Sequence, residues 1–185
     1  NGLVLVTGPT GSGKTTTLYS TLKRLSSPQV NVTSIEDPIE MVVDDFNQIA
    51  VQRKIDLDFA KALRHILRQD PDIIMVGEIR DLETAKIAME ASITGHLVLT
   101  TLHTNDAPSS LTRLLEMGLE SYMISSAVKC IVAQRLVRRL CDKCKEEADI
   151  SDIPLEDEIK PILKDKTIYK SAGCTRCNDT GYYGR

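Results

Sequence analysis

The chain has 185 residues and 42% of them are hydrophobic, enough for one fair-sized domain with a real core or for one domain and a small appendage. Its formal net charge of −3 excludes a global basic field for nucleic acid. We expect no signal peptide in it, and no run approaches the roughly 18 apolar residues that span a bilayer.

The ends of the sequence predict a fragment of a longer protein. Asn1 leads at once into the first predicted strand, and the chain stops after Gly184-Arg185 without a terminating signal. Targeting signals could therefore lie in segments outside this sequence.

The first predicted elements enclose a glycine-rich motif. Residues 3–6 are an apolar run typical of a buried strand, and Leu18, Leu22 and Leu25 recur at helical spacing. The segment between them fits G-x-x-x-x-G-K-[ST], the phosphate-binding loop. Its residues are Gly8, Pro9, Thr10, Gly11, Ser12, Gly13, Lys14 and Thr15. A glycine-rich turn could match by chance, but the flanking strand and helix are those that the motif requires.

This loop has the chemistry of a nucleotide site. Glycines let the backbone turn tightly and direct successive N–H groups at an anion, and the start of the helix adds its dipole. We expect the loop residues and Thr16 to bind ATP, with Lys14 reaching the β- and γ-phosphates. The Thr15 hydroxyl is expected to ligate Mg²⁺.

Strands and helices alternate along the next part of the chain. We predict strands over residues 29–35, 73–76 and 96–102, with short strands or a loop over 41–57. We predict helices over 58–70 with Asp58 as the N-cap, 82–92, 107–117 and 122–140, the last burying Cys130 as a small core residue. This alternation predicts a parallel α/β sheet.

Acidic and imidazole side chains follow the ends of these strands. The second strand ends in the acidic cluster Glu36, Asp37 and Glu40, and the next two strands end at Glu78 and His103. In an open parallel sheet, ligands bind at the carboxyl ends of the strands. We expect a carboxylate to orient the attacking water, Glu78 to hold Mg²⁺ through water, and His103 to sense the γ-phosphate. Each acid could instead be a solvated loop residue.

His96 stands at the other end of the strand that precedes His103. At about 3.3 Å per residue, an extended strand separates the two histidines by roughly 23 Å. His96 is therefore expected to be structural, or to contact a neighbouring subunit.

Four of the five cysteines form two C-x-x-C pairs, Cys141 with Cys144 and Cys174 with Cys177. This spacing predicts a structural Zn²⁺ site, with redox thiols as the alternative. Residues 145–173 between the pairs make the loop longer than the usual spacing of about 15–20 residues. Residues 145–160 within it are acidic, including Asp152, Glu156, Asp157 and Glu158, and predict a solvated connector.

Three longer segments resemble the secretion ATPases, the motors of type II secretion and of type IV pilus assembly and retraction. Residues 67–81 resemble the family signature, residues 36–40 its aspartate box and residues 94–104 its histidine box. The run Gln134-Arg135-Leu136-Val137-Arg138 before the cysteines resembles the secretion and pilus-extension branch.

The resemblance implies a RecA-like P-loop NTPase core with a largely parallel sheet over residues 1–140. A tetracysteine zinc-binding subdomain would follow over 141–185. It implies that Glu40 is the catalytic glutamate and Glu78 the Mg²⁺-associated one. It further implies a hexamer in the full-length protein and an inner-membrane platform protein as partner. The location would be cytoplasmic and peripheral to the inner membrane, with N-terminal domains supplying arginines in trans.

Two other functions stay open. A RecA-type DNA translocase or helicase would need basic or aromatic loops, whereas aromatic residues make up 4% of this chain and Trp is absent. No nucleic-acid partner is therefore expected. A non-hydrolysing nucleotide switch would not need the acidic cluster or His103.

Overall fold

The computed structural model describes residues 1–152, 160–163 and 166–185. The chain divides into two compact units, Asn1–Arg135 and Leu136–Arg185. The first unit contains a six-stranded sheet and the second a two-stranded sheet.

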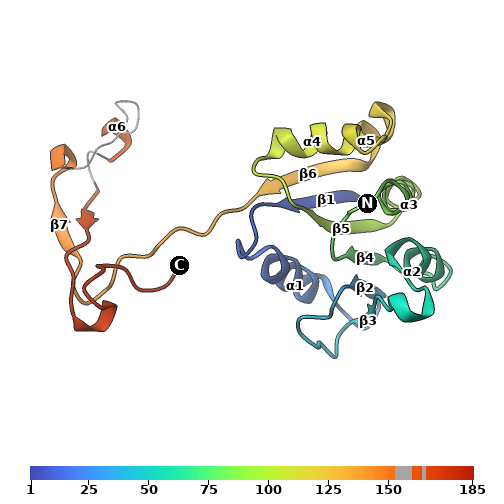
Figure 1. The fold of residues 1–185 in the computed structure, drawn as a ribbon, viewed down its shortest axis with the longest axis horizontal. Coiled ribbons are helices and arrows are strands. Elements are labelled where there is room, and N and C mark those ends of the chain that lie inside the picture. The colour runs from blue at the N-terminus through green and yellow to red at the C-terminus, as the bar shows by residue number, and fades with distance from the viewer. Residues whose placement is uncertain (153–159, 164–165) are drawn as a thin grey trace. The chain divides into compact units, whose positions relative to one another are not determined.

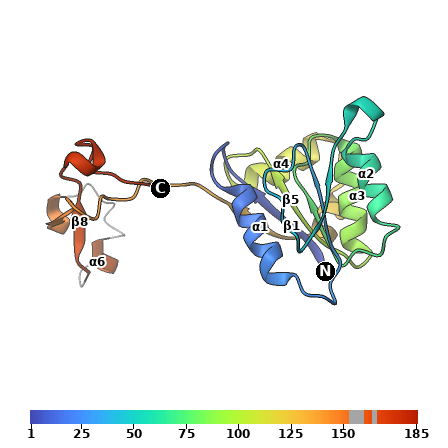
Figure 2. The ribbon, with the colours of Figure 1, turned by 90° about the horizontal axis from the view of Figure 1, so that it is seen from below.

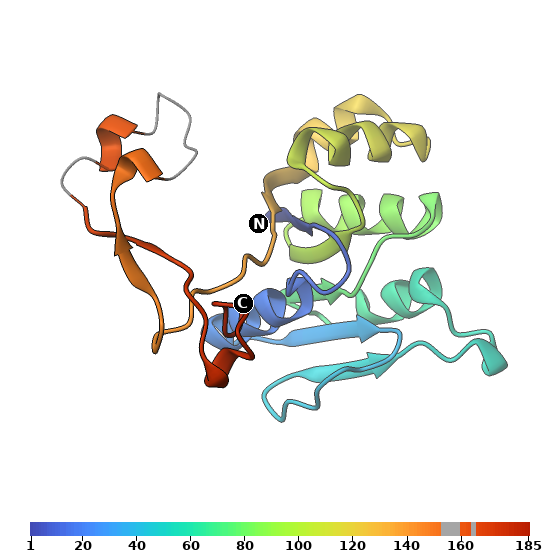
Figure 3. The same ribbon diagram turned by 60° about the vertical axis from the view of Figure 1, so that its left-hand side comes forward.

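The sheet of the first unit is parallel throughout, as the alternation of strands and helices predicts. Its strand order is β3-β2-β4-β5-β1-β6, with β3 and β6 at the two edges (Figure 1, Figure 3). The strands are β1 (Gly2–Thr7), β2 (Val32–Glu36), β3 (Asn47–Ala50), β4 (Ile73–Val76), β5 (Leu97–Leu102) and β6 (Val128–Ala133).

Helices cover both faces of this sheet. Figure 2 shows α1 on one side and α2 and α3 on the other. The helices of this unit are α1 (Lys14–Leu25), α2 (Phe59–Ile66), α3 (Leu82–Ile93), α4 (Ala107–Glu116) and α5 (Ser121–Ala127), and a short 3-10 helix covers Arg53–Ile55. Two apolar cores result, one under α1 and one under α2, α3 and α5.

The strand β4 shows why a run of apolar residues is needed at the centre of the sheet. Successive side chains of a strand point to opposite faces. Ile74 and Val76 enter the core under α2 and α3, whereas Ile73 and Met75 enter the core under α1. All four residues are buried, as expected for a strand with helices on both faces.

Three helices begin with an aspartate whose side chain caps the backbone. Asp58 accepts from the Lys61 N–H at 2.8 Å, and this confirms the predicted N-cap of α2. Asp81 and Asp106 cap α3 and α4 in the same way. The start of α1 differs, because its N-cap Gly13 offers no side chain. The first N–H groups of α1 are therefore open to another acceptor.

The predicted helix over residues 122–140 is confirmed only to Ala127 and is wrong beyond it. Helix α5 ends at Ala127, and the chain continues as the edge strand β6, which pairs with β1 in parallel. The β-branched residues Val128, Ile131 and Val132 favour this strand, and β1 offers an otherwise open edge. Cys130 lies exposed on β6 and is not the core residue we predict from the sequence.

The second unit is small and contains the paired cysteines. Its strands β7 (Glu146–Ala148) and β8 (Ile168–Lys170) pair antiparallel, and its short helices are η2 (Ile150–Asp152), α6 (Lys160–Leu163) and η3 (Thr175–Cys177). Glu146 and Glu147 of the acidic segment are exposed on β7. Glu156, Asp157 and Glu158, also predicted to belong to the solvated connector, lie outside the described residues.

Candidate functional site

The glycine loop lies between the end of β1 and the start of α1, at the carboxyl edge of the sheet. Gly8, Gly11 and Gly13 have φ angles of 145°, 75° and 84°, a region that favours glycine. A Cβ on Gly8 would lie 2.2 Å from the backbone oxygen of Gln134. The loop therefore requires glycine at its first position for a close approach as well as for its turn.

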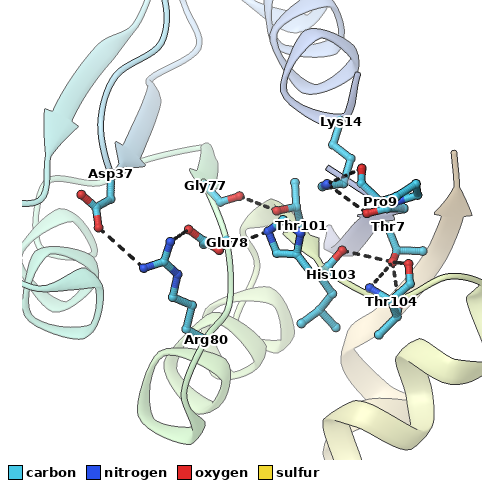
Figure 4. A network of polar contacts seen from close by, with 12 residues as sticks. Thr7, Pro9, Lys14, Asp37, Gly77, Glu78, Arg80, Thr101, His103 and Thr104 are labelled. Carbon is cyan, nitrogen blue, oxygen red and sulfur yellow. Dashed lines mark hydrogen bonds and ion pairs between the residues drawn. The ribbon is translucent and has the colours of Figure 1, made fainter. Parts of the chain in front are cut away.

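Lys14 is folded into this loop. Its side chain is 8% exposed, and Nζ donates to the carbonyl oxygens of Gly8 at 3.0 Å and Pro9 at 3.2 Å (Figure 4). Burial lowers the pKa of Lys14, and the carboxylates of Glu78 and Glu40 act in the opposite direction. The ammonium group of Lys14 is thus held inside the loop by the loop's own backbone.

A buried hydroxyl in the loop tests whether a phosphate group fits here. Ser12 is buried, and its Oγ has no hydrogen-bond partner among the described residues. Buried polar groups are normally hydrogen-bonded, so an orphan beside uncapped N–H groups and a lysine suits an anionic ligand. The loop from Gly8 to Thr16 has the donors that nucleotide phosphates require.

Ionisable side chains cross the carboxyl edge of the sheet in one connected row, called here the charged row after its acids and arginines. His103 Nε2, after β5, lies 3.3 Å from a carboxylate oxygen of Glu78, after β4. Arg80 pairs with the other oxygen of Glu78 and lies 3.9 Å from Asp37 (Figure 4). Arg53 also pairs with Asp37, at 2.8 Å. The parallel sheet thus brings Glu78 and His103 together.

The three acids that follow β2 have separate environments. Glu36 is buried, where it accepts from the Tyr19 hydroxyl and from Ser34 Oγ. Asp37 belongs to the charged row, and Glu40 is exposed. Glu40 lines an open cavity of about 640 Å³ together with Thr15 and Thr16. Of the three acids, Glu40 is therefore the one free to act on a ligand beside the loop.

His96 lies at the opposite end of β5 from His103. Its Nδ1 is 2.9 Å from the carbonyl oxygen of Ala91 in α3. This local contact matches the structural role predicted for it.

Two features of this edge are not predicted from sequence patterns. Arg80 bridges Glu78 and Asp37, and its place two residues after Glu78 in the family signature is the only sequence signal for it. The hydroxyls of Thr7 and Thr104 lie 2.6 Å apart and tie the end of β1 to the segment after His103. No local pattern could reveal this second pair, because its members are far apart in the chain.

The four paired cysteines of the second unit come together. Their sulfur atoms all lie within 4.8 Å of one another. The separations are 3.9 Å for Cys141–Cys174 and 3.8 Å for both Cys144–Cys177 and Cys174–Cys177. Tetrahedral zinc with Zn–S bonds of about 2.3 Å places its sulfurs about 3.8 Å apart, whereas a disulfide needs about 2.0 Å. The cluster therefore fits a zinc ion.

The backbone around Cys177 favours a thiolate. Burial acts to raise the pKa of this thiol, but the N–H groups of Cys174 and Gly181, each 3.3 Å from Sγ, lower it to about 7. A metal ligand must be deprotonated, so these contacts suit a metal site. Four sulfurs fill all four coordination positions of a zinc ion and leave none for a substrate or water. A zinc ion bound here would therefore have a structural role.

The fold and the glycine loop together define the class of protein to which the chain belongs. A parallel sheet with helices on both faces, and a glycine loop leading from β1 to an uncapped α1, is the architecture of P-loop nucleotide-binding proteins. Among the described residues, no helix is both long and apolar enough to cross a membrane.

Comparisons with known proteins give the family. The family model described as "Type II/IV secretion system protein" matches residues 1–185. The chain is 55% identical over 187 residues to the type IV pilus assembly ATPase TfpB of Acinetobacter baylyi, with coverage of 100% of this chain and 32% of the relative. It is 53% identical over 189 residues to the type II secretion system ATPase E of Vibrio cholerae, with coverage of 100% and 37%.

Solved structures agree with this result. The pilus retraction motor PilT with bound ADP superposes with a TM-score of 0.69 at 41% identity, covering 76% of this chain and 44% of that one. The Legionella pneumophila ATPase DotB gives 0.61 at 29% identity, covering 89% and 48%. The chain belongs to the type II/IV secretion system protein family, and the predicted α/β class is confirmed. It spans about a third of the length of the curated relatives named here.

Proposed function

We propose that this chain is the nucleotide-binding and hydrolysing part of an ATPase motor for type II secretion or type IV pilus assembly. The observation that carries the proposal is the placement of Lys14. It is buried in a glycine loop beside an uncapped helix start, where its Nζ donates to the carbonyl oxygens of Gly8 and Pro9. The family of the chain supports the same function.

The proposed roles follow from these positions. The backbone of residues 8–16 and Lys14 bind the phosphates of ATP. Thr15 and Glu78 hold Mg²⁺, which supplies charge neutralisation when bound. Glu40 orients the attacking water from the open cavity beside Thr15. His103, which contacts Glu78, senses the γ-phosphate.

We propose a structural zinc subdomain over residues 141–185, within the second unit, appended to an ATPase core over 1–140. The four sulfurs support the zinc ion. Residues 136–140 belong to the second compact unit by their contacts. The Arg139 N–H donates to the carbonyl oxygen of Gly184, and Leu140 forms an antiparallel β-bridge with Tyr182. The compact units divide before Leu136, whereas the proposed boundary at Cys141 marks the first of the four cysteines.

Oligomeric state and partners are proposed from the family. The full-length protein would be a hexamer that works on an inner-membrane platform protein from the cytoplasmic side. The relatives are named as ATPases of secretion and pilus machines, in keeping with this proposal. Light scattering of the full-length protein with and without nucleotide tests the hexamer.

The test of the proposed function is the Lys14→Ala variant. Removing the charge in the loop should weaken ATP binding and lower turnover by about tenfold or more, which is about 1.4 kcal/mol of barrier. Both quantities are measured in the full-length protein, with Lys86→Ala on the exposed side of α3 as the matched control. Unchanged binding and turnover in Lys14→Ala would refute the site.

A further inference from the structure

Gln134, directly after the edge strand β6, contacts the phosphate loop although it is distant from it in the sequence. Its backbone N–H donates to the carbonyl oxygen of Thr7 at 2.8 Å. Its side-chain Nε2 donates to the carbonyl oxygen of Ser12 at 2.8 Å, and its Oε1 accepts from Thr17 Oγ1 at 2.8 Å. One residue thus touches the end of β1, the middle of the loop and the first turn of α1.

The contact with Ser12 fixes the direction of a backbone donor. The carbonyl of Ser12 and the N–H of Gly13 belong to one planar trans peptide, in which the two groups point in opposite directions. Holding the Ser12 oxygen toward Gln134 therefore turns the Gly13 N–H away from Gln134. This N–H belongs to the open donors at the start of α1 that an anion accepts from.

The orientation of the Gln134 amide follows from its two partners. The Ser12 carbonyl can only accept a hydrogen bond, so it must face the amide NH₂ group. The Thr17 hydroxyl then donates to the amide oxygen. A flipped amide would place two oxygens against each other at Ser12. The amide therefore has one allowed orientation. We call its two hydrogen bonds, to Ser12 and from Thr17, the clamp.

Gly8, the first residue of the loop, lies close against the backbone of Gln134. Gly8 has a φ of 145°, and a Cβ there would lie 2.2 Å from the Gln134 backbone oxygen. The backbone of Gln134 therefore packs against Gly8 while its side chain holds Ser12.

We propose that Gln134 is a positioning residue for the nucleotide, which directs the Gly13 N–H at a phosphate by holding the Ser12 carbonyl. The inference rests on the proposed function, because it assumes that the loop binds nucleotide phosphates. A phosphate held in this way is bound equally in the ground state and the transition state. Its loss therefore raises Kd and KM more than it lowers kcat.

Two substitutions of Gln134 test the clamp. Gln134→Met keeps the length of the side chain and removes both hydrogen bonds. Gln134→Glu keeps the acceptor for Thr17 but loses the donor to Ser12. Gln134→Met should raise the Kd and KM for ATP about tenfold, and Gln134→Glu, which also brings a negative charge beside the loop, by at least as much, with kcat within about twofold of the wild type in both. Gln69→Met, at an exposed site, is the control and should leave Kd, KM and kcat unchanged.

Substitutions of Thr17 test the other half of the clamp. Thr17→Val removes the hydroxyl that orients the amide and should raise Kd by about threefold. Thr17→Ser keeps the hydroxyl and should restore wild-type binding. These variants keep the inference testable if a Gln134 variant fails to fold.

The outcomes separate this inference from the proposed function. All variants are measured in the full-length protein, with ATP binding by calorimetry and turnover by phosphate release. Wild-type Kd and KM in both Gln134 variants would overturn the inference, as would a loss confined to kcat. A wild-type protein that does not bind ATP would instead overturn the proposed function, and the inference with it.

Discussion

Glu36, the buried acid at the end of β2, is the clearest case of a single residue that organises its surroundings. Glu36 is buried and accepts from three neutral donors, Tyr19, Ser34 and Gln48. Burial, with the neighbouring Glu36 carboxylate, raises the pKa of the Tyr19 phenol, so this donor stays protonated. A buried carboxylate persists only when its hydrogen bonds are satisfied.

The same network holds the loop that contains Glu40. Gln48 Oε1 accepts from the Val43 N–H at 2.7 Å, and Gln48 Nε2 donates to the Met41 carbonyl at 3.0 Å. Nε2 also lies 3.1 Å from Glu36. The loop beside the open cavity is therefore linked through Gln48 to Glu36 of β2 and, by a contact of Nε2 with the Tyr19 hydroxyl at 3.2 Å, to α1.

Removing one donor from Glu36 should lower stability. Tyr19→Phe leaves the carboxylate buried with fewer partners, and the expected cost is about 1–3 kcal/mol in the free energy of unfolding. Chemical denaturation measures this cost, and Tyr122→Phe at an exposed site is the control. Equal stability of Tyr19→Phe and the wild type would show that the network does not hold Glu36.

Sequence patterns locate the loop, Glu78 and His103, because each directly follows a strand whose end can be placed. They do not give the contacts among side chains. The bridge from Arg80 to Asp37 depends on the spacing of β2 and β4, and the contact of Gln134 with Ser12 depends on the pairing of β6 with β1. Such contacts need the tertiary structure, since no local pattern encodes them.

At the scale of elements, prediction succeeds where a segment has one consistent environment. Strand β4 is buried on both faces and reads as an unbroken apolar run. Helix α2 has an apolar stripe and a capping Asp58 that mark its face and its start. In both cases the local sequence and the tertiary packing favour the same structure.

The strand β6 shows where prediction fails. Its apolar residues follow α5 without a break, and a short apolar run does not distinguish helix from strand by periodicity. The deciding interaction is the pairing with β1, whose residues are over a hundred positions away. Because β6 is an edge strand with exposed residues, burial gives no local signal either.

At the scale of the whole molecule, the two compact units are expected to differ in what holds them together. The first unit has two apolar cores around its sheet. Among the described residues of the second unit, Cys141 and Cys177 are its buried hydrophobic residues. A small unit with so little core needs another source of stability, and a metal ion held by four thiolates provides it.

This contrast predicts the effect of removing zinc. The purified protein should contain one zinc per chain, and a chelator or Cys174→Ser should raise amide hydrogen exchange in residues 141–185. Exchange in β1 and β4 should stay low, because those strands do not use the cysteines. Cys130→Ser, which changes an exposed cysteine outside the cluster, is the control.

One result would contradict the zinc site, and another would contradict the boundary at Cys141. A metal-free protein with a disulfide between the cysteine pairs would exclude the zinc site. Unfolding of the whole chain in one step on chelation would show that residues 141–185 belong to the core, and the proposed boundary would be wrong.

The central claim is that ATP bound at the loop is hydrolysed at the carboxyl edge of the sheet. Glu40 lines the cavity beside Thr15, and Asp44 lines the same cavity from the same loop. Glu40→Gln keeps the shape of the side chain and removes the charge that orients water, whereas Asp44→Asn makes the same chemical change as a control.

The most direct measurement is therefore ATP turnover beside ATP affinity in full-length Glu40→Gln. We predict that turnover falls by about a hundredfold or more while affinity stays within about threefold, and that Asp44→Asn keeps both. Loss of affinity with turnover at saturating ATP unchanged would contradict the account, because Glu40 would then bind nucleotide and not act on water.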